Sequence, residues 1–300
     1  MTLIDLPDLD AVETQTENAS REFVLTVSCP DQVGIVYAIS EFLSARGHNI
    51  SEHQQFDDTG LGKVHVRTAF TTQEPQLTAD LAGEFQHIAD RFGMQFSMHG
   101  AILPRLLLMV SKSGHCLNDL IFRWRTGTLK AEIALVVSNH EDLRPMAEAA
   151  GIPYLYVPLA PEGKEAAEAK LLELIEEHQI DLVVLARYMQ IFSDSLARQL
   201  AGRAINIHHS FLPGFKGARP YHQAHARGVK LIGATAHYVT TDLDEGPIIE
   251  QEVIRVDHTY NPRTLAQAGQ SAESQALSRA VQWHCEHRVL LDGHSTVVFR

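Results

Sequence analysis

The fold is decided by residues 204–217, which read Ala-Ile-Asn-Ile-His-His-Ser-Phe-Leu-Pro-Gly-Phe-Lys-Gly. The segment begins as a short apolar strand and runs into polar residues followed by a loop with proline and glycine. Side chains alternate between the two faces of a strand, so Asn206 and His208 share one face while Ile205 and Ile207 share the other. We therefore predict a buried strand that carries an amide and an imidazole to the edge of a loop.

Similar apolar strands recur upstream of this segment. Strands are predicted at residues 106–110, 133–137, 182–185 and 204–207, and helices at 117–125, 142–149, 164–178 and 194–200. Continuous apolar strands that alternate with helices are typical of a mainly parallel sheet covered on both faces. Ligands of such sheets bind beyond the carboxyl ends of the strands, so we expect the chemistry there.

The pattern changes towards the end of the chain. Two strands, 231–239 and 248–256, follow one another without an obvious helix between them, which predicts an antiparallel edge or hairpin. Residues 264–291 have the apolar spacing of a long helix, and 296–299 are a candidate final strand. With the preceding elements they predict a Rossmann-like α/β domain over residues 105–300.

The amino-terminal part predicts a different domain. Residues 22–100 indicate the order strand, helix, strand, strand, helix, strand, and the two middle strands are joined by a loop with two glycines. This βαββαβ order is the ferredoxin-like split unit. We therefore predict an acidic, disordered leader over residues 1–20, a ferredoxin-like domain over 21–100 and the α/β domain over 105–300.

Composition narrows the classes of partner and compartment. The formal net charge is −12, which argues against nucleic acid as a partner because a phosphate footprint needs a surplus of Lys and Arg. The longest apolar stretches have five residues, 106–110 and 133–137 among them, whereas a membrane span needs about 20. Three scattered cysteines fit a reduced compartment, and the acidic first residues are unlike a signal peptide. We expect a cytoplasmic protein with neither nucleic acid nor membrane as a partner.

Three polar residues stand out as candidates for catalysis. Asn206 supplies a neutral amide donor, and His208 can exchange a proton near neutral pH. Asp244, in the turn between the last two long strands, is placed to orient that histidine. Together they suit a carbonyl carbon that becomes tetrahedral. Considered without the neighbouring sequence, Asn206 also fits a residue that caps the end of a strand, and His208 fits a structural histidine whose hydrogen bonds are all made within the protein. Asp244 also fits an ordinary turn residue.

Several segments carry a family resemblance. Residues 206–213, 233–239 and 242–249 read Asn-Ile-His-His-Ser-Phe-Leu-Pro, Gly-Ala-Thr-Ala-His-Tyr-Val and Asp-Leu-Asp-Glu-Gly-Pro-Ile-Ile. They resemble the formyltransferase family that uses 10-formyltetrahydrofolate, whose Asn, His and Asp match Asn206, His208 and Asp244. Residues 29–36, Cys-Pro-Asp-Gln-Val-Gly-Ile-Val, resemble an ACT domain. An ACT domain followed by a formyltransferase domain is similar to the order in the formyltetrahydrofolate deformylase family.

This resemblance implies a reaction. It is the hydrolysis of 10-formyltetrahydrofolate to tetrahydrofolate and formate, serving one-carbon balance and formate supply for purine synthesis, with no cofactor. The loop after residue 110 holds one glycine, where glycinamide ribonucleotide transformylases hold a phosphorylated substrate in a Gly-rich loop, so water is the expected acceptor. Two alternatives stay open: formyl transfer to another small amine, and a catalytically idle sensor of amino acids or folate.

The resemblance also implies residues that bind ligands. For the folate substrate these are Arg187, Tyr188, Met189, Ser210, Gly217 and His237. A surface salt bridge is the alternative for Arg187, and a buried structural role is the alternative for His237. For an amino-acid effector of the ACT domain they are Asp31, Gln32, Gly34, Ile35, Asn49 and Ile50. The alternative is a domain that only assembles subunits, and either way we expect a homo-oligomer.

The 17 histidines raise the question of a metal site. His222 and His225 are spaced to share a helix face, and His208, His209 and His237 lie in or near the motifs above. However, the sequence contains no H-E-x-x-H or comparable ligand set. We therefore expect no catalytic metal.

Overall fold

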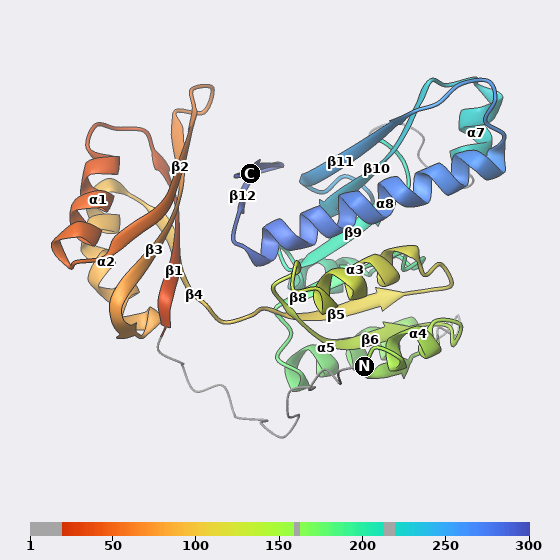
Figure 1. The fold of residues 1–300 in the computed structure, drawn as a ribbon, viewed down its shortest axis with the longest axis horizontal. Coiled ribbons are helices and arrows are strands. Elements are labelled where there is room, and N and C mark those ends of the chain that lie inside the picture. The colour runs from red at the N-terminus through yellow and green to blue at the C-terminus, as the bar shows by residue number, and fades with distance from the viewer. Residues whose placement is uncertain (1–19, 159–162, 213–219) are drawn as a thin grey trace, which may run out of the picture. The chain divides into compact units, whose positions relative to one another are not determined.

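The computed structural model describes residues 20–158, 163–212 and 220–300 (Figure 1). The chain divides into two compact units, Met1–Ile102 and Leu103–Arg300. The predicted leader therefore lies outside the described residues except for Ser20. Among the described helices, none is long and apolar enough to cross a membrane.

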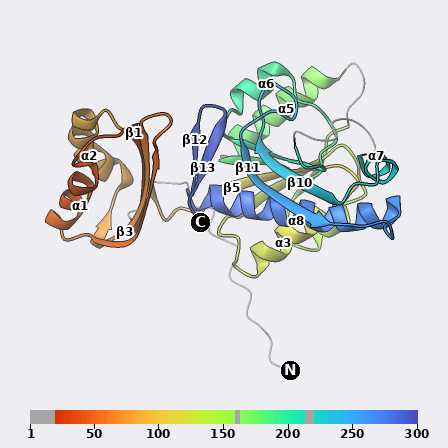
Figure 2. The ribbon, with the colours of Figure 1, turned by 90° about the horizontal axis from the view of Figure 1, so that it is seen from above.

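The amino-terminal unit is a four-stranded sheet with two helices on one face (Figure 2). Its elements are β1 (Ser20–Pro30), α1 (Ile35–Ala45), β2 (Asn49–Asp58), β3 (Lys63–Gln76), α2 (Thr78–Phe92) and β4 (Gln95–Gly100). The spatial order is β2-β3-β1-β4 and every pairing is antiparallel. The predicted βαββαβ fold is confirmed.

Alternation along the strands builds the core of this unit. Phe23, Leu25 and Val27 of β1 are all buried and pack with Phe42 of α1 and Phe85 of α2. The intervening residues of β1 are partly exposed, and no helix of the described amino-terminal unit lies over that face of the sheet (Figure 2). In β1, the alternation of buried and partly exposed residues is what a strand with one face in the core predicts.

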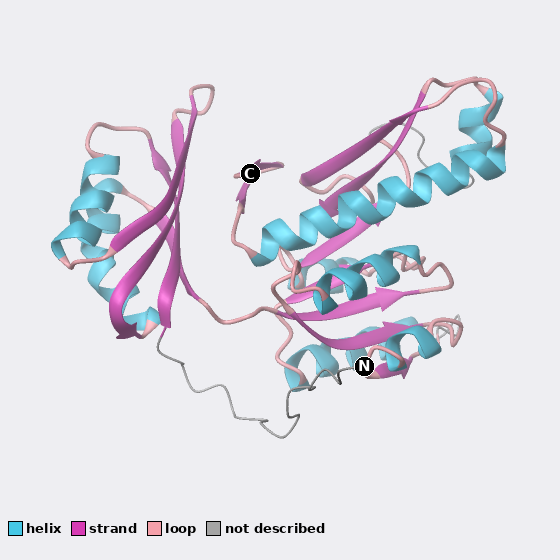
Figure 3. Ribbon diagram, in the orientation of Figure 1, coloured by secondary structure: helices cyan, strands magenta, loops and turns pink. Residues whose placement is uncertain are grey.

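The second unit contains a seven-stranded sheet in the order β11-β10-β9-β8-β5-β6-β7 (Figure 3). Its strands are β5 (Arg105–Val110), β6 (Glu132–Ser138), β7 (Tyr154–Tyr156), β8 (Leu182–Leu185), β9 (Ala204–His208), β10 (Leu231–Tyr238) and β11 (Ile248–Arg255). Its helices are α3 (His115–Arg125), α4 (Arg144–Glu148), α5 (Lys164–Glu177), α6 (Asp194–Gln199), α7 (Pro220–Ala226) and α8 (Pro262–Cys285). Strands β5 to β9 are parallel, and β10 and β11 are antiparallel. The predicted mostly parallel α/β architecture is confirmed.

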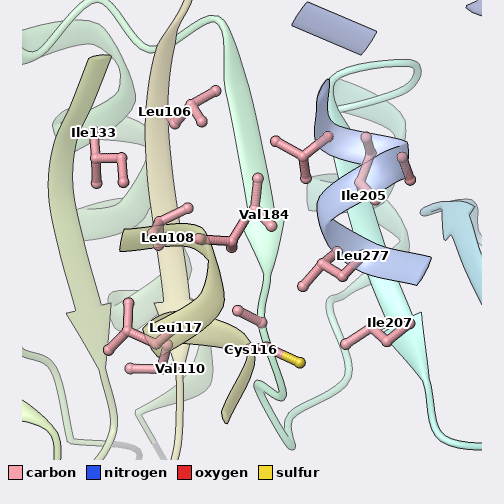
Figure 4. Close-up of a cluster of buried hydrophobic side chains, with 14 of the residues drawn as sticks. Leu106, Leu108, Val110, Cys116, Leu117, Ile133, Val184, Ile205, Ile207 and Leu277 are labelled. Atoms are coloured by element: carbon pink, nitrogen blue, oxygen red, sulfur yellow. The ribbon is translucent and has the colours of Figure 1, made fainter. Parts of the chain in front are cut away.

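Helices cover both faces of this sheet. Leu106, Leu108 and Val110 of β5 pack with residues of α3 and α8 (Figure 4). Leu107 and Met109, on the other face of β5, pack with residues of α5 and α6. The chain winds from β5 to β6 and β7 on one side, and later through β8 and β9 on the other. The carboxyl ends of β5 and β8 therefore meet at a topological switch point, where open α/β sheets bind ligands.

Three details differ from the sequence prediction. The last helix ends at Cys285 instead of 291, and the strand expected at 296–299 is one half of a hairpin, β12 (Val289–Asp292) and β13 (Ser295–Val298). The helix stops because His287 adopts a left-handed conformation, with φ of 52°, and Arg288 N–H then bonds back to the Trp283 carbonyl. A glycine would have signalled that stop in the sequence, whereas histidine did not. Strand β7 and helix α7 are short elements that the prediction missed.

The buried position of Leu108 gives a direct test of this packing. Leu108 is 0% exposed, so Leu108→Ala leaves a cavity beneath α3 and α8 and is expected to lower the free energy of unfolding by about 2–5 kcal/mol. Urea denaturation followed by tryptophan fluorescence measures it, because both tryptophans, Trp124 and Trp283, lie in the second unit. Leu61→Ala, at a side chain that is 61% exposed, is the control and should leave the midpoint unchanged. Equal midpoints for the two variants would contradict the packing described.

Candidate active site

Strand β9 brings Asn206 and His208 to one face of the sheet. Ile205 and Ile207 belong to the cluster that packs against α8, while Ala204 belongs to the cluster on the opposite face. The alternation therefore directs Asn206 and His208 away from α8, as predicted from the period of two. His208 is the last residue of the strand and is buried.

The neighbouring strand β10 supplies His237 to the same face. His237 pairs with Asn206 in the antiparallel register, and Asn206 Nδ2 lies 3.3 Å from His237 Nε2. The other ring nitrogen, Nδ1, lies 2.9 Å from the Tyr238 carbonyl oxygen. A carbonyl oxygen only accepts, so Nδ1 carries the proton and Nε2 accepts from the Asn206 amide. Burial lowers the pKa of His237, which keeps this ring neutral.

The loop between β10 and β11 carries Asp244 to His208. Asp244 Oδ2 lies 3.2 Å from His208 Nδ1, and Asp244 Oδ1 lies 3.8 Å from His237 Nε2. Asp244 has a φ of 58°, a left-handed conformation that Asp tolerates better than most residues. Gly246 fixes the loop, because a Cβ there would lie 1.8 Å from the Tyr238 carbonyl oxygen. The structure thus brings together the three residues predicted to be catalytic.

The hydrogen bond between His208 and Asp244 favours the ionised carboxylate and fixes the tautomer of the neutral His208 ring. That bond lowers the pKa of Asp244 below its ordinary value, so the carboxylate is ionised and can only accept. Nδ1 of His208 therefore donates to Asp244, and the lone pair of a neutral ring lies on Nε2. Nε2 is buried and has no hydrogen-bond partner among the described residues. This atom is placed to take a proton from a bound reactant.

These groups line an open cleft of about 650 Å³. Its walls include residues 187–192, which follow β8, residues 206–209 at the end of β9, and residues 239–244 after β10. Tyr188 and Met189 lie there, as predicted, and burial raises the pKa of Tyr188 to about 12. The loop is held at Met189, whose N–H donates to Ser111 Oγ at 3.1 Å. Ser111 in turn donates to Asn139 Oδ1 at 2.7 Å, so the ends of β5, β6 and β8 are tied together.

Arg187 contacts a group of buried polar side chains centred on Glu273. Glu273 of α8 is 1% exposed, lies 3.2 Å from Arg187 Nε, and accepts hydrogen bonds of 2.7 Å from His115 and from Tyr221. Burial raises the pKa of Glu273, but the bond from His115 and the charge of Arg187 more than offset this, so the net shift is downward. Gly269 makes room, because a Cβ there would lie 1.9 Å from the Tyr221 hydroxyl. The predicted alternative of a surface salt bridge does not describe Arg187, because its ion pair is internal.

Sequence reasoning gave no role to Glu273, Gly246 or His209. A signal for Glu273 was present, since it stands between Ala272 and Ala276 in the apolar stripe of the predicted long helix. A lone carboxylate in such a stripe indicates a buried partner of opposite charge. The roles of Gly246 and His209 depend on contacts between β9, β10 and α7, which the sequence does not show.

Two of the predicted substrate-binding residues stand apart from the rest. Ser210 is buried, and its carbonyl accepts a hydrogen bond from Thr235 Oγ1 at 3.0 Å, which orders the turn after β9. Gly217 lies outside the described residues. Their binding of substrate stays a prediction.

The predicted effector residues occupy two ends of the amino-terminal sheet. Gln32 Nε2 donates to the Phe92 carbonyl, Asp31 N–H bonds to the Gly62 carbonyl, and Gly34 has a φ of 100° where α1 begins. Asn49 and Ile50, however, pair with the far end of β3, which is level with Glu22 of β1. At about 3.3 Å per residue, Glu22 and Pro30 of β1 are roughly 26 Å apart. A single pocket with both sets would therefore need residues from two chains.

One group of potential metal ligands occurs among the described residues, His115, Cys116 and Glu273. Arg187 contacts the same carboxylate, and a guanidinium there opposes a second cation. Burial also raises the pKa of Cys116 far above its ordinary value, so its thiolate is disfavoured. The chemistry of these donors does not fit a metal ion. The group is better described as an internal ion-pair network.

Comparisons with known proteins show the family of the chain. Residues 104–281 match the model of the formyl transferase family. A formyltetrahydrofolate deformylase of Corynebacterium sp. (strain P-1) is 50% identical over 279 residues, which are 92% of this chain and 98% of that protein. The crystal structure of a formyltetrahydrofolate deformylase from Burkholderia mallei has a TM-score of 0.88 at 50% identity, and covers 93% of this chain and 100% of that one.

A second kind of relative matches only part of the chain. The glycinamide ribonucleotide transformylase 1 of Symbiobacterium toebii has a TM-score of 0.63 at 29% identity, and covers 68% of this chain and 97% of that one. The deformylases, in contrast, match nearly the whole length, including the amino-terminal unit. The chain therefore belongs to the formyltetrahydrofolate deformylase family.

Proposed function

We propose that the protein hydrolyses 10-formyltetrahydrofolate to tetrahydrofolate and formate. The observation that carries this proposal is the meeting of Asn206, His208 and Asp244 at one cleft, with Nε2 of His208 buried and unpaired among the described residues. Full-length relatives that share half of the sequence are named for this substrate and this reaction.

The first step is the attack of water on the formyl carbon. The Asp244 carboxylate accepts a hydrogen bond from Nδ1–H of His208, so Nε2 is free to remove a proton from water while the water oxygen forms the new bond. The negative charge that develops on the formyl oxygen is met by the amide of Asn206. One amide hydrogen is held by His237 Nε2, which fixes the plane of the amide and leaves the second hydrogen for the oxyanion.

The second step is the loss of the amine. The tetrahedral intermediate collapses, the bond between carbon and the folate nitrogen breaks, and His208 returns its proton to that nitrogen. Formic acid then ionises to formate and a proton. The adjacent Asp244 carboxylate stabilises the imidazolium form of His208 between the two steps.

The amino-terminal unit is proposed to be an ACT domain that assembles and regulates the enzyme. An amino-acid effector would bind the loop of Asp31, Gln32, Gly34 and Ile35. The residues Asn49 and Ile50 of a second chain would face it, which supports a homo-oligomer because one chain keeps the two sets apart.

The three cysteines are free and buried, which supports a reducing, cytoplasmic location.

A formate assay tests the reaction. Purified protein mixed with 10-formyltetrahydrofolate alone is expected to release formate and tetrahydrofolate in equal amounts, because water is the acceptor. Formate and tetrahydrofolate are quantified with and without added glycine or other small amines. Formyl-amine products with little formate would identify a formyltransferase instead, and binding of folate without turnover would identify a sensor.

Substitution of Asn206 tests the oxyanion donor. A well-placed donor contributes about 3 kcal/mol to the transition state, so Asn206→Ala should lower kcat about a hundredfold with little change in KM. Steady-state formate release measures it, with circular dichroism as the check that the fold is intact. An intact Asn206→Ala protein with unchanged kcat contradicts the assigned role.

The lowered pKa of Asp244 gives a pH-dependent prediction. The folded state favours the ionised carboxylate, so the stabilisation it provides is complete above the unfolded pKa and lost as pH falls through the lower folded pKa. Asp244→Asn, which keeps the side-chain shape and tolerates the left-handed backbone, should therefore destabilise the protein at pH 7 and much less at pH 3. Urea midpoints of both proteins at the two pH values measure the difference. A difference between the two urea midpoints that is larger at pH 3 than at pH 7 would contradict the lowered pKa of Asp244.

A further inference from the structure

His209 is a cleft residue to which the proposed mechanism gives no role. It directly follows His208 at the end of β9 and lines the cleft together with Asn206, His208 and Asp244. Its ring is stacked on that of His208, with centroids 5.1 Å apart and planes inclined by 25°. The centroid of the Tyr221 ring of α7 lies 6.5 Å from that of His209. Two stacked imidazoles thus line the same cleft as the proposed catalytic residues.

The state of His209 differs from that of a surface histidine. Burial lowers its pKa to about 4, and the charge of Arg187 and the neighbouring His208 add to this shift. Glu273 and Asp244 act in the opposite direction and do not cancel it. His209 is therefore neutral at physiological pH, with one N–H donor and one nitrogen lone pair.

The hydrogen-bonding capacity of His209 is unused within the described chain. Its ring nitrogens make no hydrogen bond to another described residue, although the ring is half-buried. His208 Nε2, in the ring stacked on it, is likewise unpaired among the residues described, and it is also fully buried. Polar atoms without partners on two stacked rings in a cleft mark a place where a small polar molecule binds.

We propose that His209 is a catalytic residue that binds the attacking water together with His208. This inference rests on the proposed hydrolysis. The water donates one hydrogen to the lone pair of His209 and the other to His208 Nε2, which leaves an oxygen lone pair directed at the formyl carbon. When the carbon–oxygen bond forms, the proton moves to His208 Nε2, the carbonyl electron pair moves to the formyl oxygen, and His209 keeps its hydrogen bond without a change of charge.

A purely structural role for His209 makes the opposite prediction from a water-binding role. If the ring only packs against His208, an aromatic side chain replaces it and a smaller polar one does not. If the nitrogen binds water, a polar side chain replaces it and an aromatic one does not. Phe keeps the stacked ring and removes both nitrogens, whereas Gln removes the ring and keeps a neutral donor and acceptor.

The experiment compares His209→Phe and His209→Gln in the full chain, with 10-formyltetrahydrofolate as substrate. We expect kcat to fall about a hundredfold in His209→Phe and less than tenfold in His209→Gln, with KM within about threefold in both, because water is lost and folate contacts are not. Binding of tetrahydrofolate and circular dichroism check the site and the fold. His225→Phe, at an exposed histidine of α7, is the matched control and should retain full kcat.

The outcomes separate the two proposals. A His209→Phe protein that is at least as active as His209→Gln overturns the water-binding role while leaving hydrolysis intact. A rise in KM with kcat unchanged in both variants also overturns it, since this indicates folate contact. Absence of formate release by the wild type and by His225→Phe defeats the proposed function itself, and the role of His209 with it.

Discussion

The antiparallel register between β9 and β10 is the constraint on which the site depends. It sets His237 opposite Asn206 and Thr235 opposite His208. Because side chains alternate with a period of two, a slip of one residue would place Ala236 beside Asn206 and turn His237 to the α8 face. The register is held at its end by Thr235, whose hydroxyl donates to the Ser210 carbonyl and accepts from Leu212 N–H. A hydroxyl on β10 thus fixes the turn in which β9 ends.

Two acceptors that cannot donate fix the tautomers of the two histidines beside Asn206. The Tyr238 carbonyl determines which nitrogen of His237 carries a proton, and the Asp244 carboxylate does the same for His208. The direction of each remaining hydrogen bond follows from these two, including the one that orients the Asn206 amide. The backbone also contributes strain, since Arg187 and Asp244 both have positive φ values, 68° and 58°. Such conformations persist only where the surroundings enforce them, as Gly246 and the Tyr238 carbonyl do here.

The sequence predicted the parts of the fold that repeat and missed those that depend on single contacts. The strands β5, β6 and β8 have continuous apolar stretches, so their positions and their burial on both faces could be predicted. The end of α8 could not, because His287 terminates the helix where the apolar spacing continues to Val289. Asn206 and His208 were predictable from alternation and Asp244 from its turn and the family motif. His209 was missed because its stacking on His208 arises where the strand bends after its last paired residue.

In the proposed mechanism the same three side chains would serve hydrolysis and formyl transfer alike, so the choice of nucleophile would depend on what surrounds the attacking atom. That atom carries two hydrogens and one attacking lone pair in water and in a primary amine alike. The fourth tetrahedral position around the attacking atom differs between the two nucleophiles. In water it is a second lone pair, which needs no room. In an amine it is a carbon substituent, which needs an open channel. Arg187 and Tyr221 line the cleft beside His209, and both are fixed by the buried carboxylate of Glu273. The room on that side is therefore set by a network that cannot move aside without separating a buried ion pair, which costs several kcal/mol.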